Sequence, residues 1–114
     1  MKKLLIILSL AILLTSCYDT EEVEKVSCDI VSQIIQEQWY DLAKSNKRFR
    51  EYIKQNNYEP AQCAAVKLGE PLRKDYYHNA IAYLHNGSEF EITVEIKKGH
   101  IYVQMKRDPL WLYR

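Results

Sequence analysis

The sequence predicts an α+β domain in which helices cover one face of a three-stranded antiparallel sheet. Two patterns support this fold class. Apolar residues recur at helical spacing in the first half of the chain, whereas from Tyr76 onward they alternate with polar residues. The chain has 114 residues, enough for one small domain with a modest core. We therefore expect N-terminal helices, one long and two short, packed on a β-meander and held by one disulfide.

A long amphipathic helix is expected from about residue 20 to residue 44. Asp19 suits the N-cap of this helix, and Glu22 follows three residues later, as in a capping box. Ser45 and Asn46 favour a break after it. Its apolar stripe follows near-helical spacing and consists of Val23, Val26, Ile30, Val31, Ile34, Ile35, Trp39 and Leu42.

Two shorter helices are expected after this break. Phe49, Tyr52 and Ile53 mark the first, which ends at Asn56 and Asn57. The second is predicted to begin at Pro60 and to end at Gly69, because proline suits the first turn of a helix and glycine its end.

The last two strands are predicted as a tight hairpin. Acidic and apolar residues alternate before Lys98 and Gly99, which suit a two-residue turn. Glu91 then lies opposite Lys106 on the wet face, a favourable cross-strand pair. On the core face the register pairs Ile96 with Ile101, Val94 with Val103, and Ile92 with Met105.

A first strand is expected over about residues 77–85. Asn86 and Gly87 after it are a strong hairpin signal, but two registers remain open. One uses a two-residue turn, and the other uses a longer turn that includes Ser88. The short turn brings Ile81 and Tyr83 to the core face, and the longer turn brings Ala80, Ala82 and Leu84.

The N-terminus has the features of a secretory signal. Lys2 and Lys3 give a positive flank to an apolar run over residues 4–14, which only Ser9 interrupts. A membrane-spanning helix needs about 20 apolar residues, so this run is too short to cross a bilayer. We therefore expect a targeting segment rather than part of the folded domain.

Residues 14–17, Leu-Thr-Ser-Cys, resemble the lipobox of bacterial lipoproteins, in which the cysteine is acylated and becomes the first residue after cleavage. The resemblance implies that residues 1–16 are removed and that Cys17 carries the lipid. More than one acyl chain holds a protein lastingly on a membrane. In enterobacterial lipoproteins an aspartate directly after the cysteine favours the inner membrane. Tyr18 stands there in this chain, so the resemblance implies an outer-membrane protein that faces the periplasm.

The mature chain would have 98 residues, with a short anchor over residues 17–20 and a single domain over residues 21–114. Loss of Lys2 and Lys3 lowers the number of basic groups from 16 to 14, against 15 acidic groups. The resulting net charge of −1 does not suggest binding to nucleic acid or to an anionic lipid surface.

The cysteines predict one disulfide. If Cys17 is acylated, Cys28 and Cys63 remain, and an oxidising periplasm favours a bond between them. This bond would tie the long first helix to the helix expected from Pro60. No Cys-x-x-Cys spacing occurs and the three histidines are scattered. We therefore expect no metal site and no cofactor apart from the covalent lipid.

A second resemblance concerns the middle of the chain. Residues 68–71, Leu-Gly-Glu-Pro, are followed by Asp75, Asn79, Ile81 and Tyr83 and then by a hairpin, an order that resembles the SmpA/OmlA family of small lipoproteins. The likeness covers about residues 50–105. It implies helices followed by three strands and a role in the outer-membrane β-barrel assembly machinery.

No catalytic motif is found in the sequence, which lacks GxSxG, HExxH and a phosphate-binding loop, so we expect no enzyme and no small-molecule substrate. Nine tyrosines and two tryptophans favour protein binding, because both residue types are enriched at interfaces. Trp111, Tyr113 and Tyr102 are the candidate interface residues. We expect a protein-binding module of the envelope. The alternative is an immunity or exclusion lipoprotein, or an inhibitor, that blocks a periplasmic toxin, a hydrolase or a conjugation partner.

Overall fold

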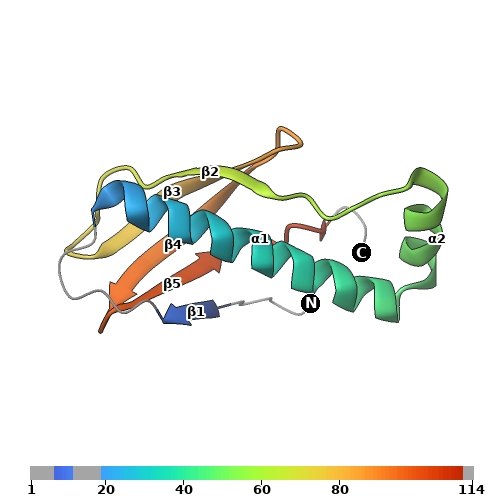
Figure 1. Ribbon diagram of the computed structural model, residues 1–114, viewed down its shortest axis with the longest axis horizontal. Coiled ribbons are helices and arrows are strands. Elements are labelled where there is room, and N and C mark those ends of the chain that lie inside the picture. Colours follow the sequence, from blue (N-terminus) through green and yellow to red (C-terminus); the bar gives the residue numbers. More distant parts are fainter. Residues whose placement is uncertain (1–6, 12–18, 112–114) are drawn as a thin grey trace.

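The computed structural model describes residues 7–11 and 19–111, with side chains described from residue 19 onward. These residues form two helices and one five-stranded antiparallel sheet with the strand order β1-β5-β4-β3-β2. Helix α1 lies across one face of this sheet (Figure 1). The elements are β1 (Ile7–Ala11), α1 (Thr20–Ser45), α2 (Lys47–Asn56), β2 (Cys63–Lys67), β3 (Tyr76–Leu84), β4 (Glu89–Lys97) and β5 (His100–Met105).

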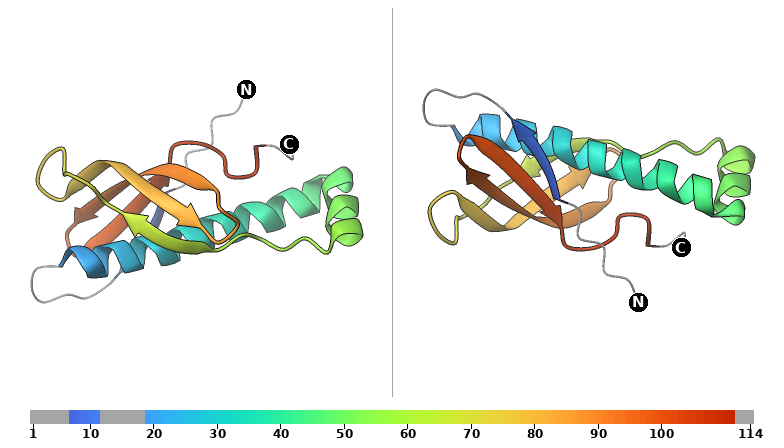
Figure 2. Two further views of the ribbon diagram at one scale, coloured as in Figure 1. Left: turned by 90° about the horizontal axis from the view of Figure 1, so that it is seen from above. Right: turned by 90° about the horizontal axis from the view of Figure 1, so that it is seen from below.

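Helix α1 confirms the predicted long helix and its cap. The Asp19 carboxylate accepts a hydrogen bond from the backbone N–H of Glu22 at 2.8 Å. At the other end, Asn46 ends α1 and caps α2, where its side chain accepts from the N–H of Phe49 at 3.0 Å. The 26 residues of α1 give a length of about 39 Å. Its last turns and α2 extend beyond the sheet (Figures 1 and 2).

The third predicted helix is wrong, because residues 63–67 form strand β2. They pair antiparallel with β3, from Cys63 opposite Leu84 to Lys67 opposite Ile81. A segment this short does not sustain a helix by itself, and pairing with β3 satisfies its backbone groups. Tertiary pairing therefore overrides the helix-start and helix-stop signals at Pro60 and Gly69.

The three C-terminal strands form the predicted meander, but the sheet has five strands rather than three, because β1 and β2 flank the meander. β1 belongs to the apolar run over residues 4–14, which we expected to lie outside the folded domain, and it pairs with β5.

The register of β4 and β5 is the predicted one. The predicted ion pair is also present, with Lys106 Nζ 3.7 Å from Glu91 Oε1. Lys98 and Gly99 both have positive φ, at 52° and 78°, as a two-residue hairpin turn with the right twist requires. The turn between β3 and β4 is longer than two residues, as the second alternative had it, but the added residue is His85 rather than Ser88. Tyr83 stands opposite Glu89, and the N–H of Leu84 donates to the carbonyl of Ser88 at 2.9 Å, so residues 85–87 form the turn.

The core has two parts. The longer turn places Ala80, Ala82 and Leu84 in the main core between α1 and the sheet. A second, smaller cluster lies at the C-terminal end of α1, beyond the sheet, and is formed by Trp39, Leu42, Phe49 and Leu110. The C-terminal segment therefore folds back onto α1 through Leu110.

Candidate protein-binding surface

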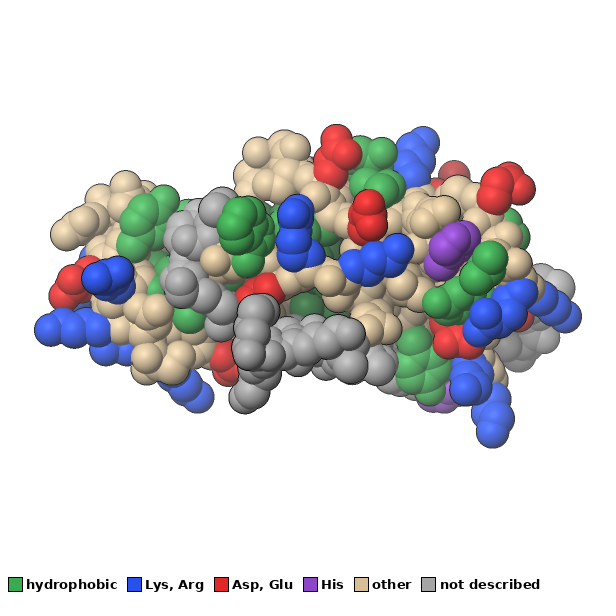
Figure 3. All heavy atoms as spheres, turned by 180° about the vertical axis from the view of Figure 1, so that it is seen from behind, with side chains coloured by type: hydrophobic (Ala, Val, Ile, Leu, Met, Phe, Trp, Pro, Cys, Tyr) green, Lys and Arg blue, Asp and Glu red, His purple; other side chains and the backbone are tan. Residues whose placement is uncertain are grey.

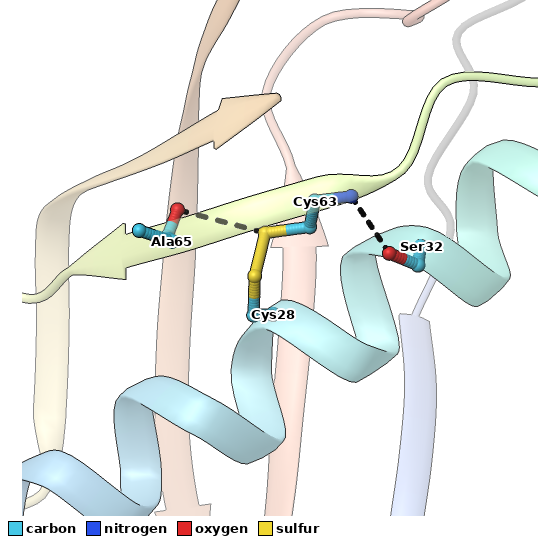
Figure 4. Close-up of a disulfide and its surroundings, with 4 residues drawn as sticks. All are labelled: Cys28, Ser32, Cys63 and Ala65. Carbon is cyan, nitrogen blue, oxygen red and sulfur yellow. Dashed lines mark hydrogen bonds between the residues drawn. A yellow bond between two sulfur atoms is a disulfide. The ribbon is translucent and has the colours of Figure 1, made fainter. Parts of the chain in front are cut away.

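The predicted disulfide is present and joins α1 to the sheet (Figure 4). Cys28 of α1 and Cys63 of β2 are bonded, with their Cα atoms 5.4 Å apart. The backbone N–H of Cys63 also donates to Ser32 Oγ at 2.8 Å, and its sulfur lies 3.5 Å from the carbonyl oxygen of Ala65. The bond fixes the entry of β2 against α1, so the tie is helix to strand rather than helix to helix.

Aromatic side chains gather where α1 meets α2. Trp39 makes an edge-on contact with Phe49 at 5.8 Å between ring centres, and Phe49 makes another with Tyr58 at 6.2 Å. Tyr40 and Tyr52 flank this group, at 5.3 Å from Trp39 and 5.5 Å from Tyr58 respectively. Such edge-to-face pairs add to the energy of apolar burial. We call these five residues, together with Trp111, the aromatic end.

Trp111 lies beside this group with its side chain largely in solvent. Its neighbour Leu110 is 3% exposed and packs in the small cluster, whereas Trp111 is 52% exposed. The guanidinium of Arg107 lies 5.7 Å from the Trp111 ring centre and 5.6 Å from that of Phe90. The tail therefore packs on the domain through Leu110 and presents Trp111 outward. Tyr113 lies outside the described residues.

A groove of about 330 Å³ runs beside Trp111. Tyr58 and Phe90 contribute aromatic surface to its lining, and Arg107 contributes a positive charge. Tyr58 thus belongs both to the aromatic contacts and to the groove. Trp, Tyr and Arg are the residue types that most often dominate binding energy at protein interfaces.

Tyr102 lies elsewhere, on the face of the sheet away from α1. It stands opposite Glu95, which also stands opposite Tyr76, and all three line a shallow depression of about 600 Å³. The Arg73 guanidinium lies 4.1 Å from the Tyr76 ring centre. Acidic and basic side chains are interspersed over this side of the molecule (Figure 3). Trp111 and Tyr102 therefore do not share one binding surface.

Sequence reasoning found Trp111 but missed the rest of the aromatic end. The available signal was Tyr40, which follows the buried Trp39 on α1 and so points away from the core stripe. Tyr52 and Tyr58 carried no comparable signal, because their contacts depend on how α2 turns against α1.

No metal-binding group forms in the part of the chain with described side chains, where no three His, Cys, Asp or Glu residues cluster. The Nδ1 atoms of His78 and His100 are buried, and neither forms a hydrogen bond with a described residue. No helix within the described ranges is long and apolar enough to cross a membrane. Residues 14–17, with Cys17, lie outside the described residues, so the lipid anchor stays a prediction.

Comparison with protein-family models, curated proteins and solved structures gives no match to this chain. The resemblance to the SmpA/OmlA family therefore stays a prediction, and a function has to be argued from the residues and geometry of this chain alone.

Proposed function

We propose that this chain is a lipid-anchored lipoprotein of the bacterial envelope that binds another protein through the aromatic end. The observation that carries the proposal is the distribution of exposed apolar side chains. Among the described residues four large ones are exposed, and three of them belong to the aromatic end: Tyr40 at 54%, Tyr52 at 39% and Trp111 at 52%. Exposed apolar residues that gather in one part of a surface mark interaction sites, and Trp111 among these three also lines the groove.

The position of the anchor supports this assignment. Only Tyr18 and Asp19 separate Cys17 from the first residue of α1. The three steps from Cys17 to Thr20 reach about 10 Å when the chain is extended, so the lipid would hold the N-terminal end of α1 close to the bilayer. The aromatic end lies at the other end of this helix, about 30 Å further along its axis. A partner in the periplasm would therefore meet the aromatic end without competing with lipid.

The chemistry of the surface favours a protein as its ligand. Rigid aromatic side chains bury large areas at a small loss of side-chain entropy, and a tyrosine hydroxyl or an indole N–H keeps a polar contact. The groove beside Trp111 adds a concave site of mixed character, in which aromatic side chains lie next to the charged Arg107 and Glu89. These features suit a short apolar or aromatic anchor of a partner, with an acidic group opposite Arg107.

The predicted cellular setting completes the proposal. The lipobox at residues 14–17 supports an envelope protein that faces the periplasm, and Tyr18 favours the outer membrane over the inner one. The likeness of residues 50–105 to SmpA/OmlA lipoproteins favours a role in outer-membrane or envelope assembly. We propose binding alone as the function, without a catalytic step or a cofactor beyond the lipid on Cys17.

The proposal is tested with the full-length chain produced in a bacterial host, crosslinked in intact cells and purified through a C-terminal tag. The key variant is Trp111→Ala combined with Tyr52→Ala. Leu72→Ala is the matched control, because Leu72 is equally exposed, at 57%, and lies in the loop before β3, outside the aromatic end. We expect the double variant to lose at least about nine-tenths of one crosslinked envelope protein and the control to retain it. Equal capture by the double variant would refute binding through the aromatic end.

A further inference from the structure

The outer edge of β5 is occupied by β1, a strand from the N-terminal apolar run. β1 pairs antiparallel with β5, from Ile7 opposite Gln104 to Ala11 opposite His100. Figure 2 shows β1 along the edge of the sheet beside β5. β1 lies within residues 1–16, which the proposed function removes. Cleavage before Cys17 would therefore turn β5 from an interior strand into an edge strand.

The backbone of β5 is arranged to pair on this outer side. His100 stands opposite Lys97 across a two-residue turn, so the N–H and C=O groups of His100 and of every second residue after it face β4. The hydrogen bond from the N–H of Lys106 to the carbonyl of Glu91, at 3.1 Å, continues this alternation. The backbone groups of Ile101 and Val103 consequently face β1. Without β1 they have no partner strand.

β5 also lacks the features that protect edge strands from pairing. Its sequence, His-Ile-Tyr-Val-Gln-Met, contains no lysine, no acidic residue and no proline. The opposite edge of the sheet, β2, is only five residues long, is irregular between Cys63 and Ala65 and carries Lys67. The disulfide also ties β2 to α1. The β2 edge is therefore protected from pairing with another strand, and the β5 edge, once β1 is removed, is not.

The site beside β5 has a defined chemistry. Ile101 and Val103 are fully buried, and they stand opposite Leu10 and Leu8 in the register. Residues that stand opposite each other in a sheet share a face. An occupying strand therefore needs apolar residues at these two alternate positions, where α1 covers the core face, and tolerates polar residues between them.

The position of α1 argues against a second copy as the occupant. α1 contacts β1 as well as β5, so it overlies the place of the fifth strand. A symmetric pair of β5 edges would be related by a two-fold axis perpendicular to the sheet, which puts both α1 helices on the same face. The α1 helix of each copy would then overlie the β5 strand of the other copy. That strand is already covered by the α1 helix of its own chain, so the two helices would collide. A single extended segment avoids this crowding.

We propose that an extended segment of another envelope protein, with apolar residues at two alternate positions, adds to β5 as the fifth strand once residues 1–16 are removed. This inference rests on the proposed cleavage before Cys17. The β5 edge would be a second binding site, separate from the aromatic end, because a partner segment bound there would run along β5 rather than along α2. The precursor would be closed to this partner by β1, and the processed protein would be open.

Hydrogen exchange of backbone amides tests the inference on the processed protein, extracted from membranes and followed by NMR. The probe is the soluble peptide KKILSLAKK, which carries the β1 sequence, and the control is KKIDSDAKK, with acidic residues at the two alternate positions. Before addition, the amides of Tyr102 and Gln104 should exchange slowly and those of Ile101 and Val103 rapidly. The probe should slow the second pair at least about tenfold, and the control peptide should not.

Three results would overturn the inference. Ile101 and Val103 that stay rapidly exchanging with the probe would mean that β5 does not accept a strand. Protection without the probe would mean that the edge is already covered, by this chain in a monomer or by a second copy in a dimer, which sedimentation distinguishes. A mass that still includes residues 1–16 would instead refute the cleavage itself, and with it the anchoring part of the proposed function.

Discussion

Removal of the Cys28–Cys63 disulfide is expected to lower the free energy of unfolding without changing the fold. The bond joins α1 to β2 across a sequence separation of 35 residues, which includes the end of α1 and all of α2. Two hydrogen bonds join α1 to β2 and to the residue directly after β2 without the disulfide. One is from Cys63 N–H to Ser32 Oγ, and the other is from Leu68 N–H to Glu24 Oε2, at 3.0 Å. A Cys28→Ala and Cys63→Ala variant should therefore keep β2 in the sheet.

The magnitude follows from the length of the closed loop. In the chain-entropy treatment a disulfide that closes about 35 residues stabilises the folded state by about 4 kcal/mol, because it restricts the unfolded chain. Small domains have free energies of unfolding of about 5–15 kcal/mol, so this bond accounts for a large share. With a urea dependence of about 1.5 kcal/mol per molar, the unfolding midpoint should fall by about 2.5 M.

Urea unfolding followed by circular dichroism measures this effect. The double alanine variant and the wild-type protein in reductant should give the same lowered midpoint, since both lack the cross-link. Ser32→Ala is the control, because it removes one hydrogen bond at the same junction and should lower the free energy of unfolding by only about 1 kcal/mol. A change below about 1 kcal/mol in the double variant, or no response to reductant, would refute the proposed role of the bond.

Three further predictions concern single side chains. Leu110 is buried and Trp111 is exposed, so Leu110→Ala should lower the free energy of unfolding by about 3 kcal/mol and Trp111→Ala should change it by less than about 1 kcal/mol. Thermal unfolding of both variants would show whether the tail packs only through Leu110. Ser27→Ala should raise the free energy of unfolding by about 1 kcal/mol, because Ser27 Oγ is buried and has no hydrogen-bond partner among the described residues; a lower urea midpoint would contradict this. Cys17→Ser should abolish lipidation, and metabolic labelling with a fatty acid that still marks the variant would exclude Cys17 as the acylated residue.

The parts of the fold that sequence could predict are those with local signals. The hairpin of β4 and β5 follows from the turn at Lys98 and Gly99 together with strict alternation, which leaves one register with all apolar pairs on one side. The start of α1 follows from Asp19 and Glu22 in the same way. Each of these signals lies within a few residues of the structure that it determines.

The parts that sequence could not predict depend on distant partners. β2 has only five residues, and its strand form depends on pairing with β3. The face that β3 turns to the core depended on whether the turn has two residues or three, a shift of one residue that local preference does not decide. The aromatic end brings Tyr58 and Trp111 to one groove from segments far apart in the chain. Its existence therefore follows from packing rather than from any motif.

Photo-crosslinking inside living cells is the most direct test of protein binding through the aromatic end. A photoreactive amino acid replaces Trp111 in the full-length chain, and in a matched strain it replaces Leu72, which is similarly exposed but outside the aromatic end. We expect one discrete crosslinked envelope protein from position 111 and none of that product from position 72. Absence of any product from position 111, or the same product from both positions, would contradict protein binding through the aromatic end.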